Sequence, residues 1–212
     1  LFRGCHINTY RGGHLDWCLG GNLVPVASAS PSMTVVLQFL SAIWATIIDP
    51  SQMAQRIMAR RYSRGTLWMG LALVSILSVL LLRMLYFIAP VAMPLGFTPN
   101  LYGLVMACVL VILTFGLYLT GQTLGGKATF PHSFAIIIWL EAVALVIRTA
   151  QALVYLASPM LAGYVSIAGM VALLWILVNF VNEVHRFENL GRAILTILIA
   201  VIGIGFGFGL FM

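Results

Sequence analysis

Two opposite charges, Glu141 and Arg148, lie within one long apolar stretch and are the side chains best placed for chemistry. Their separation of seven residues brings them to one face of a helix, about two turns apart. An ionised side chain at the bilayer centre costs about 2.5 to 3.5 kcal/mol, so both should turn inward and pair, directly or through a water. Three roles stay open: an internal ion pair that fixes packing, a proton or substrate relay, or a partner-binding face.

Other candidate residues do not form a catalytic or metal-binding set. The sequence holds no serine–histidine–aspartate order typical of hydrolases, no His-Glu-x-x-His zinc motif and no Gly-Lys-Ser or Gly-Lys-Thr phosphate loop. Cys5 and Cys18, with His6 and His14 between them, lack the close ligand pair that most structural zinc sites use. We therefore expect no enzymatic activity, no cofactor and no metal.

The elements that must position these side chains are long apolar segments. Of the 212 residues, 62% are hydrophobic and 8% are charged, whereas a soluble globule carries about 25% charged residues. Each of five runs is close to the roughly 20 residues that a helix needs to cross a bilayer, and the connections between them are short. The runs are 67–89, 101–121, 134–157, 160–181 and 193–212. The predicted fold class is an all-α membrane protein with a five-helix transmembrane bundle over 65–212, and no nucleic acid partner.

Two kinds of segment precede these spans. Residues 1–32 show no apolar periodicity, and the first methionine is Met33, so we expect 1–32 to be a disordered or spurious extension. Residues 33–64 are expected to form two short amphipathic interfacial helices. The first, over 35–48, measures about 21 Å and is too short for a hydrocarbon core of about 30 Å.

The second short helix is predicted to be basic. Asp49 suits an N-cap and Pro50 the first helical position, with Gln52 placed to reach back to the cap. Three arginines are expected around this helix and a fourth extends the run, and we call the four the basic cluster: Arg56, Arg60, Arg61 and Arg64. They are either a solvated face or a surface held on anionic lipid headgroups, where each cation contributes about 1 kcal/mol. The pattern favours lipid.

The distribution of lysine and arginine predicts the orientation. The basic cluster precedes the first span, Lys127 lies between the second and third, and Arg186 and Arg192 lie between the fourth and fifth. The remaining two connections have neither residue. Because positive loops stay in the cytoplasm, the N-terminus is predicted to be cytoplasmic and the C-terminus periplasmic, in a bacterial inner membrane. His185, between the charged residues of the last cytoplasmic connection, is interpreted as part of a solvated cluster.

Glycines in the last span predict close helix contacts. They form two interleaved pairs four residues apart, and they are Gly203, Gly205, Gly207 and Gly209. Such pairs let two helix backbones approach closely in a membrane. Packing within the chain and association into a homo-oligomer both remain open.

Three short motifs occur in a fixed order along the chain. They are Asp49 and Pro50 before the basic cluster; Gly121, Gly125, Gly126 and Phe130 after the second span; and Asn179, Glu183, His185 and Phe187 after the fourth. In this order, and with five crowded spans, the sequence resembles the Yip family (Ypt-interacting proteins), most of all its bacterial members, especially those of alphaproteobacteria. The resemblance runs from about residue 34 to the C-terminus.

The resemblance implies a five-span membrane protein. In eukaryotic members it implies endoplasmic reticulum and Golgi membranes and interaction with Rab-type GTPases. The cytosolic N-terminal domain and the Asp-Leu-Tyr-Gly-Pro motif of those members are missing here, and only Asp49 and Pro50 stand in the matching position. A bacterial cell has no Rab, so the resemblance implies architecture more than a partner. We expect a non-enzymatic protein that organises membrane or an unknown protein partner through its basic face. The alternative is a small oligomeric transporter or channel that uses Glu141 and Arg148.

Overall fold

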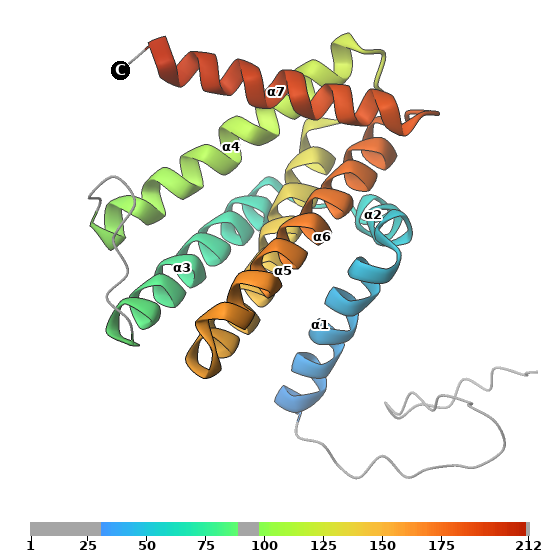
Figure 1. Ribbon diagram of the computed structural model, residues 1–212. Helices are drawn as coiled ribbons and strands as arrows, with labels where there is room; N and C mark the ends of the chain where they lie inside the picture. The colour runs from blue at the N-terminus through green and yellow to red at the C-terminus, as the bar shows by residue number, and fades with distance from the viewer. Residues whose placement is uncertain (1–30, 89–97, 211–212) are drawn as a thin grey trace, which may run out of the picture. The chain divides into compact units, whose positions relative to one another are not determined.

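The computed structural model describes residues 31–88 and 98–210, and every element within them is an α-helix. The helices are α1 (Pro31–Ile48), α2 (Pro50–Met58), α3 (Arg64–Ile88), α4 (Pro99–Thr123), α5 (Phe130–Ala157), α6 (Pro159–His185) and α7 (Leu190–Leu210) (Figure 1). Five of them, α3 to α7, are long and apolar enough to cross a membrane, which confirms the predicted fold class. The chain divides into two compact units, residues 1–38 and 39–212, and the packing below is that of the second.

Capping residues set where the long helices begin and end. Thr98 and Ser158 each accept a backbone hydrogen bond through their side-chain oxygen, at 3.4 Å, and each is followed by a proline in the first turn. At its other end α6 runs on to His185, beyond the predicted residue 181, because Arg186 is the residue that turns to the left-handed conformation, with φ 54°. Polar residues at span ends therefore belong to the helices.

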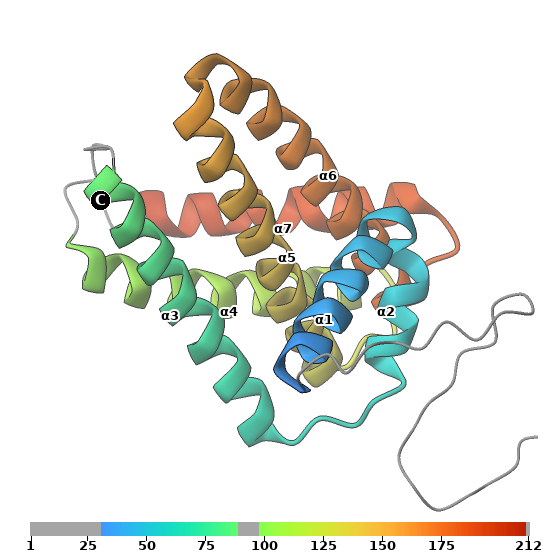
Figure 2. The same ribbon diagram turned by 90° about the horizontal axis from the view of Figure 1, so that it is seen from below.

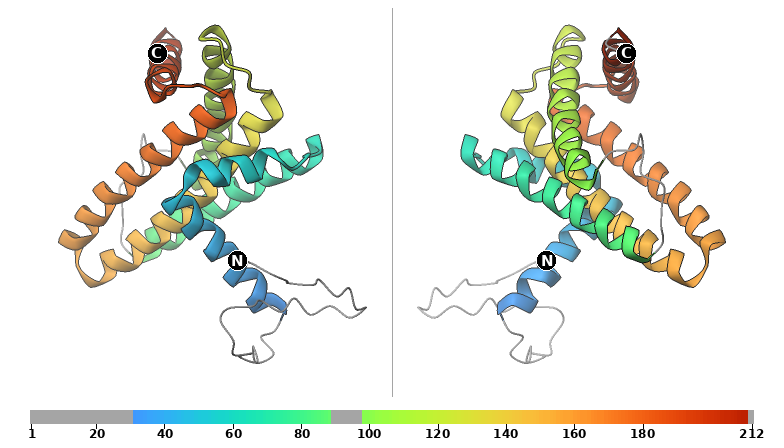
Figure 3. Two further views of the ribbon diagram at one scale, coloured as in Figure 1. Left: turned by 90° about the vertical axis from the view of Figure 1, so that its right-hand side faces the viewer. Right: turned by 90° about the vertical axis from the view of Figure 1, so that its left-hand side faces the viewer.

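α5 is the central helix of residues 39–212. It packs against α2, α3, α4 and α6, and Figure 2 shows it between α3 and α6. In its most apolar stretch 50% of the residues are buried, against 28% or less in the other four spans. α7 packs against α4 and α6, and the long helices are inclined to one another (Figure 3). The span that carries Glu141 and Arg148 is thus the most buried of the five, which lets neighbouring helices cover its polar face.

α2 has the predicted amphipathic pattern. Its apolar side chains Met53, Ala54 and Ile57 are buried against α5 and α6. The Asp49 cap is confirmed, because an Asp49 carboxylate oxygen accepts from the Gln52 backbone N–H at 3.0 Å. The predicted reach-back of Gln52 is wrong, since the Asp49 N–H already donates to the carbonyl of Ala45 at 2.9 Å. α1 and α2 therefore meet at one residue with no intervening loop.

The second half of α1 docks on α5. Ile43 is 3% exposed, and Thr46 is fully buried with its Oγ1 accepting from Trp139 Nε1 at 3.0 Å. Phe39 adds an edge-to-face contact with Trp139, at 5.9 Å between ring centres. α1 begins at Pro31, earlier than the predicted residue 35, because proline suits a first helical turn. Most of the expected extension, residues 1–30, lies outside the described residues.

Candidate functional site

The basic cluster lies on three elements instead of one helix. Arg56 is on α2, Arg60 and Arg61 follow it, and Arg64 is the first residue of α3. The expectation that Arg60 and Arg61 lie around the second short helix is wrong, because α2 ends at Met58, where the next two N–H groups bond back to the carbonyls of residues 55 and 57. All four arginines are exposed, and within the described ranges no ion pair joins them to a carboxylate. Their charges are therefore free to act on a partner outside the chain.

Two polar contacts hold α2 against the end of α6. Ser51 Oγ donates to Asn179 Oδ1 at 3.4 Å, and Gln55 Nε2 donates to Glu183 Oε2 at 3.1 Å. Asn179 is itself buried, and its Nδ2 donates to the Trp175 carbonyl one turn back at 2.8 Å. The helix that the Asp–Pro motif opens is thus fastened to the motif that closes the fourth span.

His185 is buried at the end of α6, with 1% of its surface exposed. The interpretation as a solvated cluster is therefore wrong for this residue. Its Nδ1 lies 3.1 Å from the Val181 carbonyl, and its ring stacks on Phe187 at 5.2 Å. The ring lies directly on two glycines of the second motif. A Cβ at Gly121 would overlap Nε2, and one at Gly126 would lie 2.5 Å from Cδ2, so neither position admits a side chain without moving the ring.

The connection between α4 and α5 is tied to the same histidine. The Lys127 N–H donates to the His185 carbonyl at 3.0 Å, and the Gly126 N–H donates to the Gly121 carbonyl at 2.8 Å. Gly125 has φ +86°, a conformation that glycine adopts without strain. All three sequence motifs consequently meet at one end of the chain's long helices. This contact was not predicted from the sequence. Its signal was that one histidine and two glycines follow spans that end on the same predicted side of the membrane.

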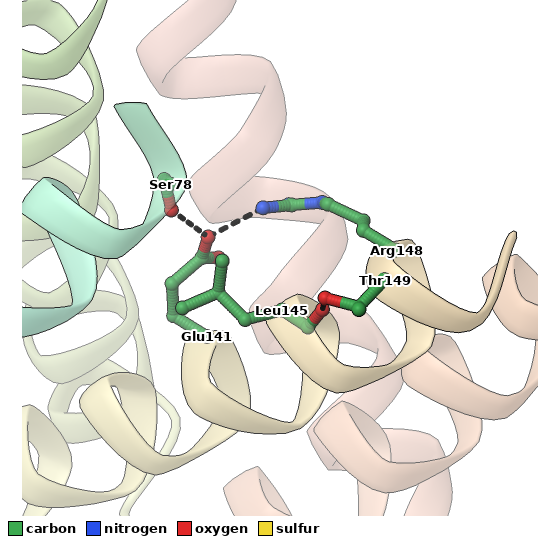
Figure 4. A network of polar contacts seen from close by, with 5 residues as sticks. All are labelled: Ser78, Glu141, Leu145, Arg148 and Thr149. Atoms are coloured by element: carbon green, nitrogen blue, oxygen red, sulfur yellow. Dashed lines mark hydrogen bonds and ion pairs between the residues drawn. The ribbon is translucent and has the colours of Figure 1, made fainter. Parts of the chain in front are cut away.

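The polar pair of α5 forms a direct bridge (Figure 4). Arg148 Nη1 lies 2.6 Å from Glu141 Oε1, and Ser78 Oγ of α3 donates to the same oxygen at 3.3 Å. The side chain of Glu141 is 7% exposed and that of Arg148 is 38% exposed. Of the two pairing modes predicted, direct contact is the one that occurs. Ser78 was missed because one serine in an apolar run has no periodic signal.

A cavity of about 380 Å³ lies beside the Arg148 end of the bridge. Its walls come from α3, α4, α5 and α6, and we call it the Arg148 cavity. Its apolar side is formed mainly by Leu81, Leu82, Leu85 and Leu145, and its polar groups are Ser78, Tyr102, Arg148, Gln151, Tyr155 and Ser166. The polar face of α5 therefore borders a space of the size that small-molecule sites have, about 300 to 1,000 Å³.

The glycine pairs of α7 do not serve packing in the described chain. A Cβ at Gly203, Gly205 or Gly207 would meet nothing within 4 Å, and the surroundings of Gly209 lie outside what the structure describes. Close approach uses other glycines, such as Gly103, where a Cβ would overlap Val79 of α3. Association of α7 with a second copy stays a prediction.

The remaining candidates are the cysteines and histidines near the start of the chain. Cys5, His6, His14 and Cys18 lie outside the described residues. Within the described residues no three His, Cys, Asp or Glu side chains are grouped so that they could hold a metal ion.

The comparison with known proteins agrees with this arrangement. The family model described as the Yip1 domain matches residues 44–211, from within α1 to just beyond α7. No curated protein and no solved structure matches the chain. The matched residues include the three motifs, the basic cluster and the α5 bridge. With five apolar helices able to cross a membrane, this multi-pass membrane protein belongs to the Yip1 domain family.

Proposed function

We propose that this protein is a non-enzymatic organiser of the bacterial inner membrane, and that its basic cluster binds anionic lipid headgroups. The observation that carries the proposal is the fixed position of α2. Its apolar face is buried and its polar residues bond to Asn179 and Glu183, while Arg56 and the arginines after it are exposed. A surface that is already ordered loses little conformational freedom on binding, so its cations act together.

The charge around the basic cluster supports a cytoplasmic position. Lys127, Arg186 and Arg192 are exposed at the same end of the spans, and together with the basic cluster they outnumber the carboxylates there. Connections 90–100 and 158–159, at the other end, contain no charged residue. Positive loops stay in the cytoplasm, where the leaflet carries anionic lipids that attract such surfaces.

Replacing all four arginines of the basic cluster by glutamine should remove most of the anionic lipid bound to the protein. Each cation near a membrane surface contributes about 1 kcal/mol, so affinity should fall by up to about a thousandfold. The measurement is mass spectrometry of lipids that copurify in mild detergent, with anionic and zwitterionic lipids counted per protein.

Two variants control that experiment. Four lysines in place of the arginines keep the charge and should keep the amount of bound anionic lipid. Arg83→Gln removes one cation from α3, away from the basic cluster, and should leave that amount unchanged. Unchanged anionic lipid in the four-glutamine variant would contradict the proposal.

The α5 bridge supports a second candidate, a small oligomeric transporter or channel. The supporting observation is that the 2.6 Å contact between Glu141 and Arg148 borders the Arg148 cavity. In liposomes loaded with a pH-sensitive dye, a relay through this pair predicts proton flux that Glu141→Gln abolishes, because the amide cannot carry the proton. Flux of equal rate in wild type and Glu141→Gln would exclude the pair as the relay.

A further inference from the structure

We propose that the Arg148 cavity binds a small monocarboxylate with an apolar body, and that its carboxylate contacts the Arg148 guanidinium. The proposal is independent of lipid binding by the basic cluster, because no residue of that cluster lines the cavity. It also holds whether or not the bound molecule crosses the membrane.

Arg148 retains hydrogen-bonding capacity beyond its bridge to Glu141. Its guanidinium has five N–H donors, and in the described chain it makes one ion pair, through Nη1 to Glu141 Oε1. The side chain is 38% exposed and lines the cavity, so part of the cation faces this space. The N–H groups that the bridge leaves free can donate to a ligand in this space, and a carboxylate accepts two of them side by side.

The charges at the cavity limit the ligand to one negative charge. Glu141 already neutralises Arg148, and no second cation lines the cavity in the described chain. A phosphate dianion would place two negative charges near the Glu141 carboxylate with one guanidinium to share. Like charges at short range repel strongly where the dielectric constant is low, so a monoanion is favoured.

The remaining lining of the cavity suits an apolar ligand body. Four leucines line the cavity, and an apolar body would bury their surface. The volume of about 380 Å³ lies at the small end of ligand sites. Gln151 and Ser166 lie on the facing helices α5 and α6 and offer a second polar contact. A short-chain fatty acid such as octanoate has this combination of one carboxylate and a compact apolar chain.

The test is equilibrium binding of radiolabelled octanoate to the full chain in lipid nanodiscs, with empty nanodiscs subtracted. Arg148→Gln should weaken binding roughly ten- to a hundredfold, the usual value of a hydrogen bond to a charged group. Glu141→Gln should tighten binding about tenfold, because it releases the guanidinium and removes a neighbouring negative charge. A purely structural role of the pair would move both variants in the same direction.

Matched ligands and variants make the outcome decisive. Octan-1-ol and octylammonium should bind more weakly than octanoate, and Arg83→Gln, which removes an arginine outside this cavity, should bind octanoate like wild type. If octan-1-ol binds as tightly as octanoate, the cavity is an apolar site for a lipid chain and the proposal is overturned. If Arg148→Gln does not fold, the gain expected in Glu141→Gln still decides, since unchanged or weaker binding there overturns it too.

Discussion

Gly121→Ala is expected to lower the free energy of unfolding by about 3 kcal/mol, the upper end of what one inserted methyl group costs in a packed interior. The new Cβ would overlap Nε2 of His185. The ring has no room to retreat, because it is 1% exposed, lies against the Val181 carbonyl through Nδ1 and stacks on Phe187. The measurement is thermal or denaturant unfolding of the purified protein in detergent micelles.

His185→Ala supplies the rescue that identifies the cause. Alone it should destabilise, because it leaves a cavity where the ring lies. In the double variant with Gly121→Ala the added methyl group enters that cavity, so the two losses should fall short of additivity by about 1 to 3 kcal/mol. Gly126→Ala should be rescued less, since its Cβ would also lie 2.7 Å from the Gly121 carbonyl.

Gly163→Ala is the matched control for Gly121→Ala. It lies on α6, and a Cβ there would meet nothing within 4 Å. Alanine is favoured over glycine in a helix by about 0.5 to 1 kcal/mol, so this variant should be as stable as wild type or slightly more stable. Equal stability of Gly121→Ala and Gly163→Ala would mean that His185 does not rest on the second motif.

Arg148→Leu is expected to cost about 3 to 5 kcal/mol, and Glu141→Leu clearly less. The asymmetry follows from burial. Without Arg148, the Glu141 carboxylate stays 7% exposed and keeps the 3.3 Å hydrogen bond from Ser78. Without Glu141, the guanidinium, 38% exposed in the bridge, still faces the Arg148 cavity. Unfolding in detergent micelles measures both variants.

Replacing both partners separates the charge from the packing. With methionine at 141 and 148 together, no buried charge is left alone, and stability should lie within about 1 kcal/mol of wild type or above it. Equal losses in Arg148→Leu and Glu141→Leu, or a double variant as unstable as Arg148→Leu, would contradict this account of the bridge.

The spans and the bridge follow from local patterns in the sequence. Long apolar runs predict helices α3 to α7, and a spacing of seven places Glu141 and Arg148 on one face. The start of α5 was placed too late, at residue 134, because Ser133 and His132 dilute the apolar pattern while Pro131 begins the helix. Hydropathy identifies the apolar middle of a helix, whereas capping residues define its ends.

The contacts between segments could not be predicted in the same way. Charged neighbours on both sides made His185 look solvated, yet it shares a buried helix face with Val181 and Val184. Its position on Gly121 depends on how α6 lies against α4, and no local periodicity contains that information. The same holds for the hydrogen bond from Ser78 to Glu141 and for the Arg148 cavity, because both form only where α3 packs against α5.

The bond from Lys127 to the His185 carbonyl, with the ring seated on two glycines, has a consequence for biogenesis. A ribosome makes the α4–α5 connection long before it makes the end of α6. Until then Gly121 and Gly126 lack the His185 ring that packs on them, and the first three spans lack a contact that only the fourth span supplies. A nascent chain arrested before residue 185 would therefore expose the connection between α4 and α5 to quality-control proteases without its bond to His185.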